Sequence, residues 1–213
     1  MIGIYGGTFN PVHYGHLRTA IEVKERLALE QIRMLPCRLP AHRQQPEASA
    51  EMRLAMLELA ISATPGLQVD THELQRPGPS YMVDTLRSLR SELADIPLML
   101  IIGSDAFAGL ESWYEWQQLF EYAHLVVITR PGYIQHALPP VLQVRRIENQ
   151  SLLAQQAAGH LFFLGVTLLD ISATQIRHLI ASGSSAQFLL PDAVLAFIQQ
   201  HQLFQPPPLP SGY

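Results

Sequence analysis

Six apolar runs alternate with amphipathic stretches along this chain, and that alternation limits the folds open to it more than any other feature. The runs are Ile2–Tyr5, Ile32–Leu35, Leu67–Thr71, Leu98–Ile102, Leu125–Thr129 and Leu161–Leu164. Strands that alternate with helices along a sequence form parallel βαβ units, with helices on both faces of the sheet. The pattern therefore predicts an α/β protein with a Rossmann-like, doubly wound and mainly parallel sheet.

The clearest helical period is the apolar stripe formed by Met52, Ala55, Met56, Leu59 and Ala60. Its members recur every three or four residues, which is the spacing of one face of a helix. Further helices are predicted over Leu17–Ala28, over Tyr81–Leu93, over Ile176–Ile180 with Gly183 as its stop, and from Pro191 onward, where proline suits the first turn.

The length favours a single domain over residues 1–205. The proline-rich residues 206–213 are expected to form an extended or disordered tail. The single cysteine, Cys37, excludes an intrachain disulfide framework and is expected to be a small residue near a strand end. The sequence leaves open whether the protein is a homo-oligomer.

The composition is that of a globular protein, with 48% hydrophobic and 15% charged residues and a net charge of −4. A protein that binds nucleic acid or a membrane surface would normally carry a basic field, so neither is expected as a partner. The chain shows no basic leader and no apolar run of membrane-spanning length. We therefore expect a cytoplasmic protein.

A glycine-histidine turn follows the first predicted strand. Gly6 and Gly7 end the strand, and His13 and His16 stand at the start of the next helix. Unpaired N–H groups at a helix N-terminus stabilise anions, glycines let a phosphate approach the main chain, and imidazoles add donors. The histidines could instead bind a metal or pack in the core, but zinc would need further ligands that are not evident. The turn therefore favours a polyphosphate site.

The segments that follow the predicted strands hold much of the chain's polarity: 6–16, 36–43, 103–105, 129–132 and 169–177. In an open parallel sheet, the carboxyl ends of the strands share one edge, and ligands bind there. We therefore expect these segments to converge on one site.

The segment Ile171–Arg177 is the second candidate element of that site. Asp170, Ser172 or Thr174 could simply cap the helix that follows. Arg177 lies one turn inside this helix, where its guanidinium could reach a phosphate at the same N-terminus. Spacing alone leaves both interpretations open.

Asp105, Trp113 and Tyr114 are the remaining candidates. A carboxylate such as Asp105 after an apolar strand can accept ribose hydroxyls or help hold a metal ion, or it can cap a helix. Trp113 and Tyr114 could stack on a flat ring or serve only packing. The chain has neither a P-loop nor a nucleophile elbow, which argues against an ordinary P-loop nucleotidase and a serine hydrolase.

Two of these segments together resemble the nucleotidyltransferase superfamily. Residues 7–16 resemble its signature G-x-F-x-P-x-H-x-G-H, and residues 171–177 resemble its second signature I-S-x-T-x-x-R. Further segments, at 40–43, 79–81, 101–105, 113–114 and 130–132, are similar to the bacterial nicotinate-nucleotide adenylyltransferase family. The similarity runs from Ile2 to Phe204.

The resemblance implies an enzyme of NAD biosynthesis that transfers the adenylyl group of ATP to nicotinate mononucleotide, with ATP and this mononucleotide as substrates. The alternatives are another small-molecule adenylyl- or cytidylyltransferase, such as the pantetheine-phosphate type, and a catalytically silent nucleotide-binding regulator. The chain departs from the family at Asn10, where many members have aspartate, and at Ala41, where a proline is common. Cys37-Arg38 occupies a place where relatives often carry asparagine residues near the mononucleotide.

The resemblance also implies residue roles. The ATP site would comprise Gly7, Thr8, Phe9, His13, His16, Gly103, Asp105, Ser172 and Arg177. The nicotinate mononucleotide site would comprise His42, Arg43, Ser80, Tyr81, Trp113, Tyr114 and Arg130. The catalytic residues would be His13, His16, Arg43 and Arg177. Mg²⁺ would arrive with ATP and lie near Asp105, without a metal site made of protein ligands alone.

Overall fold

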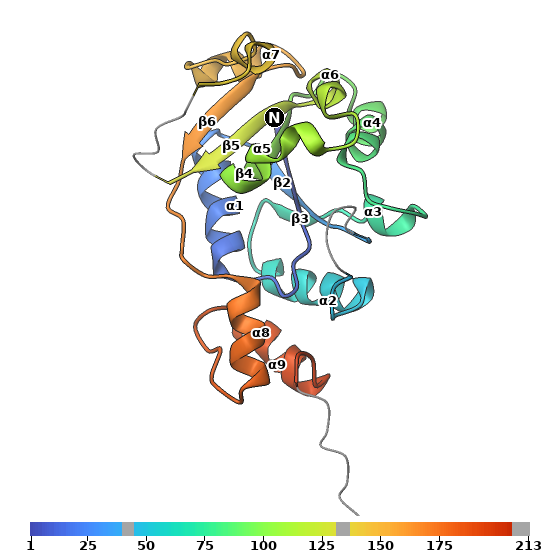
Figure 1. Cartoon of the computed structure of the whole chain (residues 1–213), viewed down its shortest axis with the longest axis vertical. Coiled ribbons are helices and arrows are strands. Elements are labelled where there is room, and N and C mark those ends of the chain that lie inside the picture. The colour runs from blue at the N-terminus through green and yellow to red at the C-terminus, as the bar shows by residue number, and fades with distance from the viewer. Residues whose placement is uncertain (40–44, 131–136, 206–213) are drawn as a thin grey trace, which may run out of the picture.

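The computed structural model describes residues 1–39, 45–130 and 137–205. Within them, six parallel strands form one sheet in the order β3-β2-β1-β4-β5-β6 (Figure 1). The strands are β1 Ile2–Gly7, β2 Gln31–Pro36, β3 Leu67–Val69, β4 Leu98–Gly103, β5 His124–Thr129 and β6 Leu161–Gly165. This order reverses direction between β1 and β4, as in doubly wound sheets. The predicted fold class is therefore confirmed.

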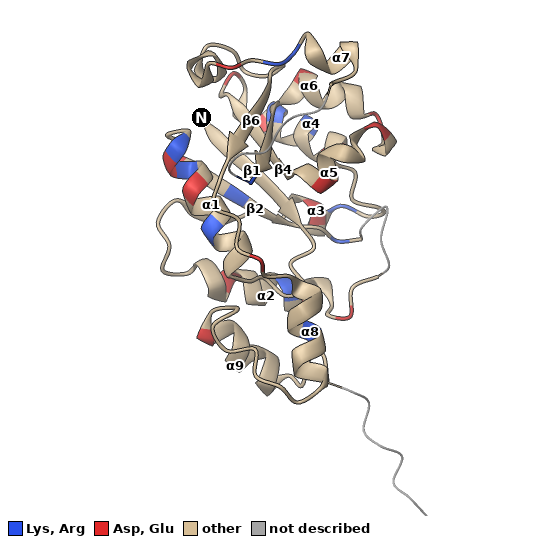
Figure 2. Ribbon diagram, turned by 60° about the vertical axis from the view of Figure 1, so that its left-hand side comes forward, with Lys and Arg blue, Asp and Glu red and all other residues tan. Residues whose placement is uncertain are grey.

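The described helices connect the strands or follow the last one. They are α1 Tyr14–Arg26, α2 Ala50–Ile61, α3 His72–Gln75, α4 Met82–Leu93, α5 Ser104–Ala108, α6 Leu119–Tyr122, α7 Pro140–Gln143, α8 Ala173–Ala181 and α9 Asp192–Gln200. Charged side chains gather along α1, whereas the strands carry few of them (Figure 2). No described helix is long and apolar enough to cross a membrane.

Alternate residues of the strands pack into two hydrophobic cores. In β4, Met99 and Ile101 belong to one core together with residues of α1, α2, α8 and α9. Leu98 and Leu100 belong to the other core together with residues of α4 and α6. This period of two is what a strand covered on both faces requires. The two cores fix the sheet, so the loops at its carboxyl edge have a rigid support.

The predicted apolar stripe of α2 is confirmed at Met56, which is buried, and at Met52 and Ala60, which pack against the core, but the buried face is rotated by about one position. Leu59 is 39% exposed, whereas Arg53, Leu57 and Ile61 are buried. Arg53 can occupy the buried face because its guanidinium donates to three main-chain carbonyls, among them that of Ala48. Apolar periodicity alone could not indicate a buried arginine.

Several predicted element ends shift slightly. β3 stops at Val69 instead of Thr71 because Thr71 already precedes α3. Helix α8 ends at Ala181, and Gly183 adopts a φ of 73°, as a helix stop requires. Pro191 precedes α9 as its N-cap rather than lying in its first turn.

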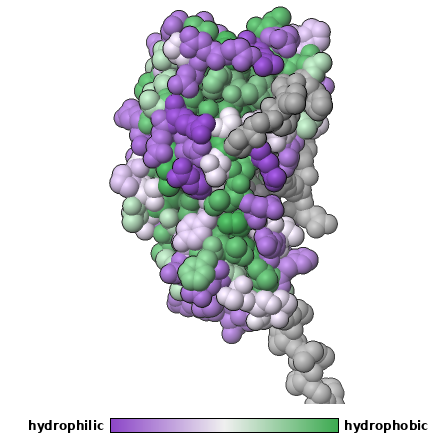
Figure 3. Space-filling view, turned by 90° about the vertical axis from the view of Figure 1, so that its left-hand side faces the viewer, coloured by the Kyte–Doolittle hydropathy of each residue, from purple (hydrophilic) through white to green (hydrophobic). Residues whose placement is uncertain are grey.

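The second half of the chain ends in α8 and α9, which lie beyond α2 at the end of the molecule away from α7 (Figure 1). Hydrophilic and apolar residues both reach the surface on the face in Figure 3, where an apolar area runs down the middle. Exposed apolar side chains in the described chain include Phe188 at 78% and Val144 at 83%. The predicted tail, 206–213, lies outside the described residues.

Candidate active site

The glycine-histidine turn joins β1 to α1 as predicted. Gly6 and Gly7 are the last residues of β1, His13 is the N-cap of α1, and His16 is its third residue. The two imidazole rings lie 3.7 Å apart between centroids. A Cβ on Gly15 would lie 2.9 Å from His13 Nδ1, so only glycine leaves room for this ring. The packing of the His13 ring therefore requires a glycine at this position of the motif.

Hydrogen bonding defines what each histidine offers to a ligand. The His13 main-chain N–H donates to His16 Nδ1 at 3.3 Å. A neutral His16 therefore carries its proton on Nε2, which is free to donate. His13 Nδ1 is buried and has no hydrogen-bond partner. Buried polar atoms are usually paired, so this nitrogen is an exception among the described residues.

Burial keeps both histidines neutral at pH 7 in the unliganded protein. It lowers the pKa of His13 to about 4. It also holds the pKa of His16 well below its usual value, with the charge of a protonated His13 as a second cause. An incoming anion would oppose this shift, because it favours the charged imidazole.

A cavity of about 600 Å³, here called the histidine pocket, opens beside the turn. It is lined by Tyr5, His13, Gly15, His16, Thr19, Gly103, Ser104, Asp105, Ile128, Arg130, Leu168, Leu169 and Ile171. It thus unites four residues predicted for ATP: His13, His16, Gly103 and Asp105. Arg130, predicted for the mononucleotide, lies in this pocket instead. Its side chain is 3.9 Å from Asp170 and largely exposed.

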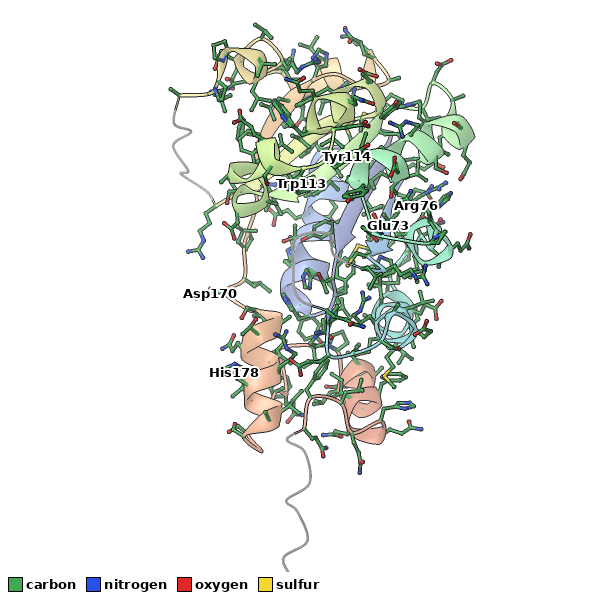
Figure 4. All side chains as sticks on the ribbon, turned by 45° about the vertical axis from the view of Figure 1, so that its right-hand side comes forward. Glu73, Arg76, Trp113, Tyr114, Asp170 and His178 are labelled. Atoms are coloured by element: carbon green, nitrogen blue, oxygen red, sulfur yellow. The ribbon has the colours of Figure 1, made fainter. Side chains whose placement is uncertain are left out.

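A second cavity of about 340 Å³, here called the aromatic pocket, lies on the other side of Asp105. It is lined by Gly6, Gly7, Thr8, Cys37, Glu73, Ser80, Tyr81, Met82, Asp105, Ala106, Gly109, Ser112, Trp113 and Tyr114. It brings together Ser80, Tyr81, Trp113 and Tyr114, as predicted. The Tyr81 and Tyr114 rings are 4.7 Å apart. Figure 4 shows Trp113 and Tyr114 near Glu73 and away from Asp170 and His178.

Asp105 connects the two cavities. It lines both of them and lies in the first turn of α5, whose N-cap is Gly103 with no side-chain capping bond. The alternative role of Asp105 as a helix cap is therefore wrong.

The second motif meets the first directly. Arg177 Nη1 donates to the Asn10 carbonyl at 2.9 Å, and Arg177 Nε donates to Glu47 at 3.0 Å. Ser172 is the N-cap of α8, and its Oγ accepts from the Gln175 N–H at 3.1 Å. Neither Ser172 nor Arg177 lines the histidine pocket or the aromatic pocket, although Ile171 lines the histidine pocket. The convergence is confirmed, and Ser172 does cap the helix.

Other predicted residues take supporting positions or fall outside the description. Phe9 is buried, with its ring 5.1 Å from that of His16, so it supports the turn and lines neither pocket. Gly7 and Thr8, predicted for ATP, line the aromatic pocket. His42 and Arg43 lie outside the described residues. No group of three potential metal ligands occurs in the part of the chain that the structure describes.

Two ionisable groups line the aromatic pocket without having been predicted as site residues: Glu73 was not predicted at all, and Cys37 only as part of the segment 36–43. Glu73 is 3% exposed and accepts a hydrogen bond from Thr85 Oγ1 at 3.1 Å. Burial raises the pKa of Glu73 and that of the Cys37 thiol. Cys37 directly follows β2, and Glu73 follows β3 by a few residues, so attention to strand ends could have found both.

The chain is similar to a family model and to curated bacterial proteins. A family model described as cytidylyltransferase-like matches residues 4–179. A protein of Methylococcus capsulatus (strain Bath) is 51% identical over 208 residues, which cover 96% of this chain and 99% of the relative. One of Pseudomonas putida (strain W619) is 47% identical over 211 residues, with 97% and 95% covered. Both are named "Probable nicotinate-nucleotide adenylyltransferase".

Solved structures show the same fold. The nicotinic acid mononucleotide adenylyltransferase of Plasmodium falciparum, complexed with NaAD, superposes with a TM-score of 0.72 at 15% identity, covering 95% of this chain and 96% of that chain. The same protein complexed with APC gives a TM-score of 0.69 at 15% identity, with the same coverage.

Proposed function

This chain belongs to the cytidylyltransferase-like family and, within it, to the nicotinate-nucleotide adenylyltransferases, and we propose that its two adjoining pockets bind the two substrates of that activity. The enzyme transfers the adenylyl group of ATP to nicotinate mononucleotide, giving nicotinate adenine dinucleotide and pyrophosphate in NAD biosynthesis. The assignment of the pockets rests on the position of Asp105. This residue lines both pockets, so it marks the place where the two substrates would meet.

The histidine pocket is the site for the ATP phosphates. His16 offers an Nε2–H, and His13 Nδ1 lacks a partner. The first N–H groups of α1 lie at the same place and carry partial positive charge. Arg177 would add charge from α8 once its guanidinium exchanges Glu47 for a phosphate oxygen.

The aromatic pocket is the site for nicotinate mononucleotide. Trp113 and Tyr114 offer aromatic faces for the pyridine ring, and Tyr81 completes the wall. Main-chain N–H groups around Tyr81 and Tyr114 can donate hydrogen bonds to the ring carboxylate. They would favour the acid over the amide form because a carboxylate is a stronger acceptor.

The reaction needs no covalent enzyme intermediate, because the attacking group is already an anion. The 5′-phosphate oxygen of the mononucleotide bonds to the α-phosphorus of ATP, and the bond from that phosphorus to the departing pyrophosphate breaks. Catalysis then consists of holding the reactants in line and neutralising charge on the transferred group. His16 and the α1 N–H groups would contact this group.

The donor set near Asp105 suits a metal ion that arrives with its substrate. Mg²⁺ usually takes one or two carboxylates, water and substrate phosphates rather than a cage of protein ligands. Asp105 can supply that carboxylate between the pockets. Bound to the triphosphate, Mg²⁺ would neutralise charge on the phosphates. The role of Asp105 is to hold this assembly where the pockets join.

A substrate panel tests the proposal. The protein is incubated with ATP and Mg²⁺ together with nicotinate mononucleotide, nicotinamide mononucleotide or phosphopantetheine, and pyrophosphate and dinucleotide are measured. We expect fastest turnover with the acid mononucleotide. Faster turnover of either other acceptor would contradict the substrate assignment, and no pyrophosphate from any of them would indicate a silent nucleotide-binding protein.

A further inference from the structure

The aromatic pocket has no cationic side chain among the described residues that line it. Its acidic groups are the carboxyls of Glu73 and Asp105. Under the proposed function, on which this inference rests, the pocket receives a substrate with a phosphate and a ring carboxylate, both negative. Anions and carboxyls of like charge repel each other in a partly desolvated cavity. A positive charge that lies behind the described lining would offset this repulsion.

Arg53 lies behind the part of the wall that Thr8 and Cys37 form. Its side chain projects from α2 and is only 1% exposed. Nη1 donates to the Thr8 carbonyl at 2.8 Å, and Nη2 donates to the Arg38 carbonyl at 3.2 Å. Nε donates to the Ala48 carbonyl at 3.3 Å. One guanidinium thus ties together the chain after β1, the chain after β2 and the chain before α2.

No Asp or Glu oxygen of the described ranges lies within 4.0 Å of the Arg53 guanidinium, and the charge of Glu51 acts on it only from farther away. Burial lowers the pKa of this guanidinium, but arginine stays charged at any pH at which proteins fold. The charge of Arg53 also acts on the pocket itself, because it opposes the rise that burial causes in the pKa of the Cys37 thiol. Keeping a buried charge without a counterion is costly.

We propose that Arg53 is a positioning residue of the mononucleotide site, which fixes Thr8 and Arg38 at the pocket wall and supplies the positive charge that the anionic substrate needs. Arg53 is separated from the pocket by its own hydrogen-bond partners, so it acts through the wall rather than by touching substrate. The three carbonyls hold the guanidinium in place but leave its net charge intact. The substrate anion, when bound, is the missing counterion.

Two substitutions separate the charge from the shape. R53M keeps a long side chain and removes the charge, whereas R53K keeps a charge but cannot span three carbonyls. At pH 7 we expect R53M to raise KM for the mononucleotide by about tenfold or more, since a unit charge at short range in protein is worth at least that factor. KM for ATP should change less than threefold, and R53K should recover most of the loss.

The pH profile of R53K supplies a second readout that folding defects do not mimic. Burial lowers the pKa of a lysine, so this variant is charged at low pH and loses its charge as the pH rises. Its KM for the mononucleotide, divided by that of the wild type, should therefore rise between pH 6 and about 9. This measurement needs only R53K, so it tests the charge role of Arg53 even if R53M does not fold.

The outcomes distinguish this inference from the proposed function. If the wild type makes no dinucleotide, the proposed function fails. If the wild type is active but R53M leaves KM for the mononucleotide unchanged, or R53K matches R53M and its KM ratio is flat with pH, the charge role of Arg53 is refuted. An equal rise in both KM values would indicate a general loss of structure, which would also refute it.

Discussion

Burial decides how the two histidines of the β1–α1 turn can act. Both are neutral at pH 7 before substrate binds, because desolvation disfavours the charged imidazole. They therefore serve as hydrogen-bond partners at first, and the α1 N-terminus supplies the partial positive charge. The phosphate that binds would then favour their protonation. The motif thus combines a fixed geometry with a charge that its ligand can induce.

The first prediction concerns His16. His16→Ala removes the donor proposed for the transferred phosphoryl group and should lower kcat by about 10²–10³. Steady-state kinetics with both substrates measure this. His178→Ala is the control, because this exposed histidine of α8 lines neither pocket. Near-normal kcat in His16→Ala would refute the role.

The second prediction concerns pH and His13. The unfolded chain protonates this residue below about pH 6.5, whereas the folded protein does so only near its pKa of about 4. The unfolded state therefore binds more protons in this interval, and stability falls as the pH drops from 6.5 towards 4. His13→Asn should show a shallower loss. Urea unfolding at several pH values tests this; parallel slopes would contradict it.

The third prediction concerns the ion pair between Glu47 and Arg177. Glu47 accepts a hydrogen bond from the Arg177 guanidinium, which the proposed function assigns to ATP. Glu47→Gln should lower KM for ATP by about two- to fivefold, since an exposed pair of this kind is worth up to roughly 1 kcal/mol. Glu58→Gln, on the exposed face of α2, is the matched control. A higher KM for ATP would mean that Glu47 instead holds Arg177 in its working position.

At the scale of elements, the two residues before α8 contribute to both the helix and the histidine pocket. Ser172 caps the helix, and Ile171 beside it lines the histidine pocket. Spacing alone left a capping role and a phosphate-binding role open; the structure shows the cap, and phosphate binding by Arg177 stays a prediction. The packing of Arg177 against Asn10 fixes the helix start at the glycine-histidine turn. A change at the cap can therefore affect stability, substrate binding or both.

The fourth prediction separates these two roles. Ser172→Ala removes the cap and should cost about 1 kcal/mol in the free energy of unfolding. Ser172→Asp keeps a capping oxygen and should restore that stability. Its negative charge should nonetheless raise KM for ATP by about tenfold if the triphosphate lies close by. Chemical denaturation and kinetics on both variants provide the measurement. An unchanged KM for ATP in Ser172→Asp would leave Ser172 as a cap only.

At the scale of the whole molecule, the doubly wound sheet brings the loops after β1, β4 and β5 together and joins two cavities at Asp105. Under the proposed function, the two substrates occupy separate cavities with one shared carboxylate. Substitutions in one cavity should therefore change KM for one substrate, and substitutions at the junction should impair the use of both substrates.

The fifth prediction follows from this arrangement. Trp113→Ala removes an aromatic face from one cavity and should raise KM for the mononucleotide by about tenfold, with KM for ATP nearly unchanged. Asp105→Asn should impair the use of both substrates. Bisubstrate kinetics on the two variants measure the separation. Equal effects of Trp113→Ala on both KM values would contradict separate cavities.

Local sequence patterns were sufficient to predict the helices and strands and the chemistry of the main motifs. Strands and helices follow from periodicity, and the parallel topology follows from their alternation, because both are set by residues close in the chain. The strand-end rule also predicted that Gly7, Asp105 and Ile171 would meet. The family resemblance identified Ser80 and Trp113 as neighbours although the chain separates them widely.

Other features depend on atoms brought together from distant segments, and no local pattern encodes them. Arg53 looks like an exposed helix residue until three carbonyls from separate loops surround it. Arg130 lies in the histidine pocket rather than with the mononucleotide residues, and Glu73 is buried beneath the aromatic wall. Such placements arise from packing and desolvation in three dimensions. Alternation therefore determined the fold, and the resemblance of two motifs to a known family indicated the reaction class, while tertiary contacts alone decided the charge and protonation of the site.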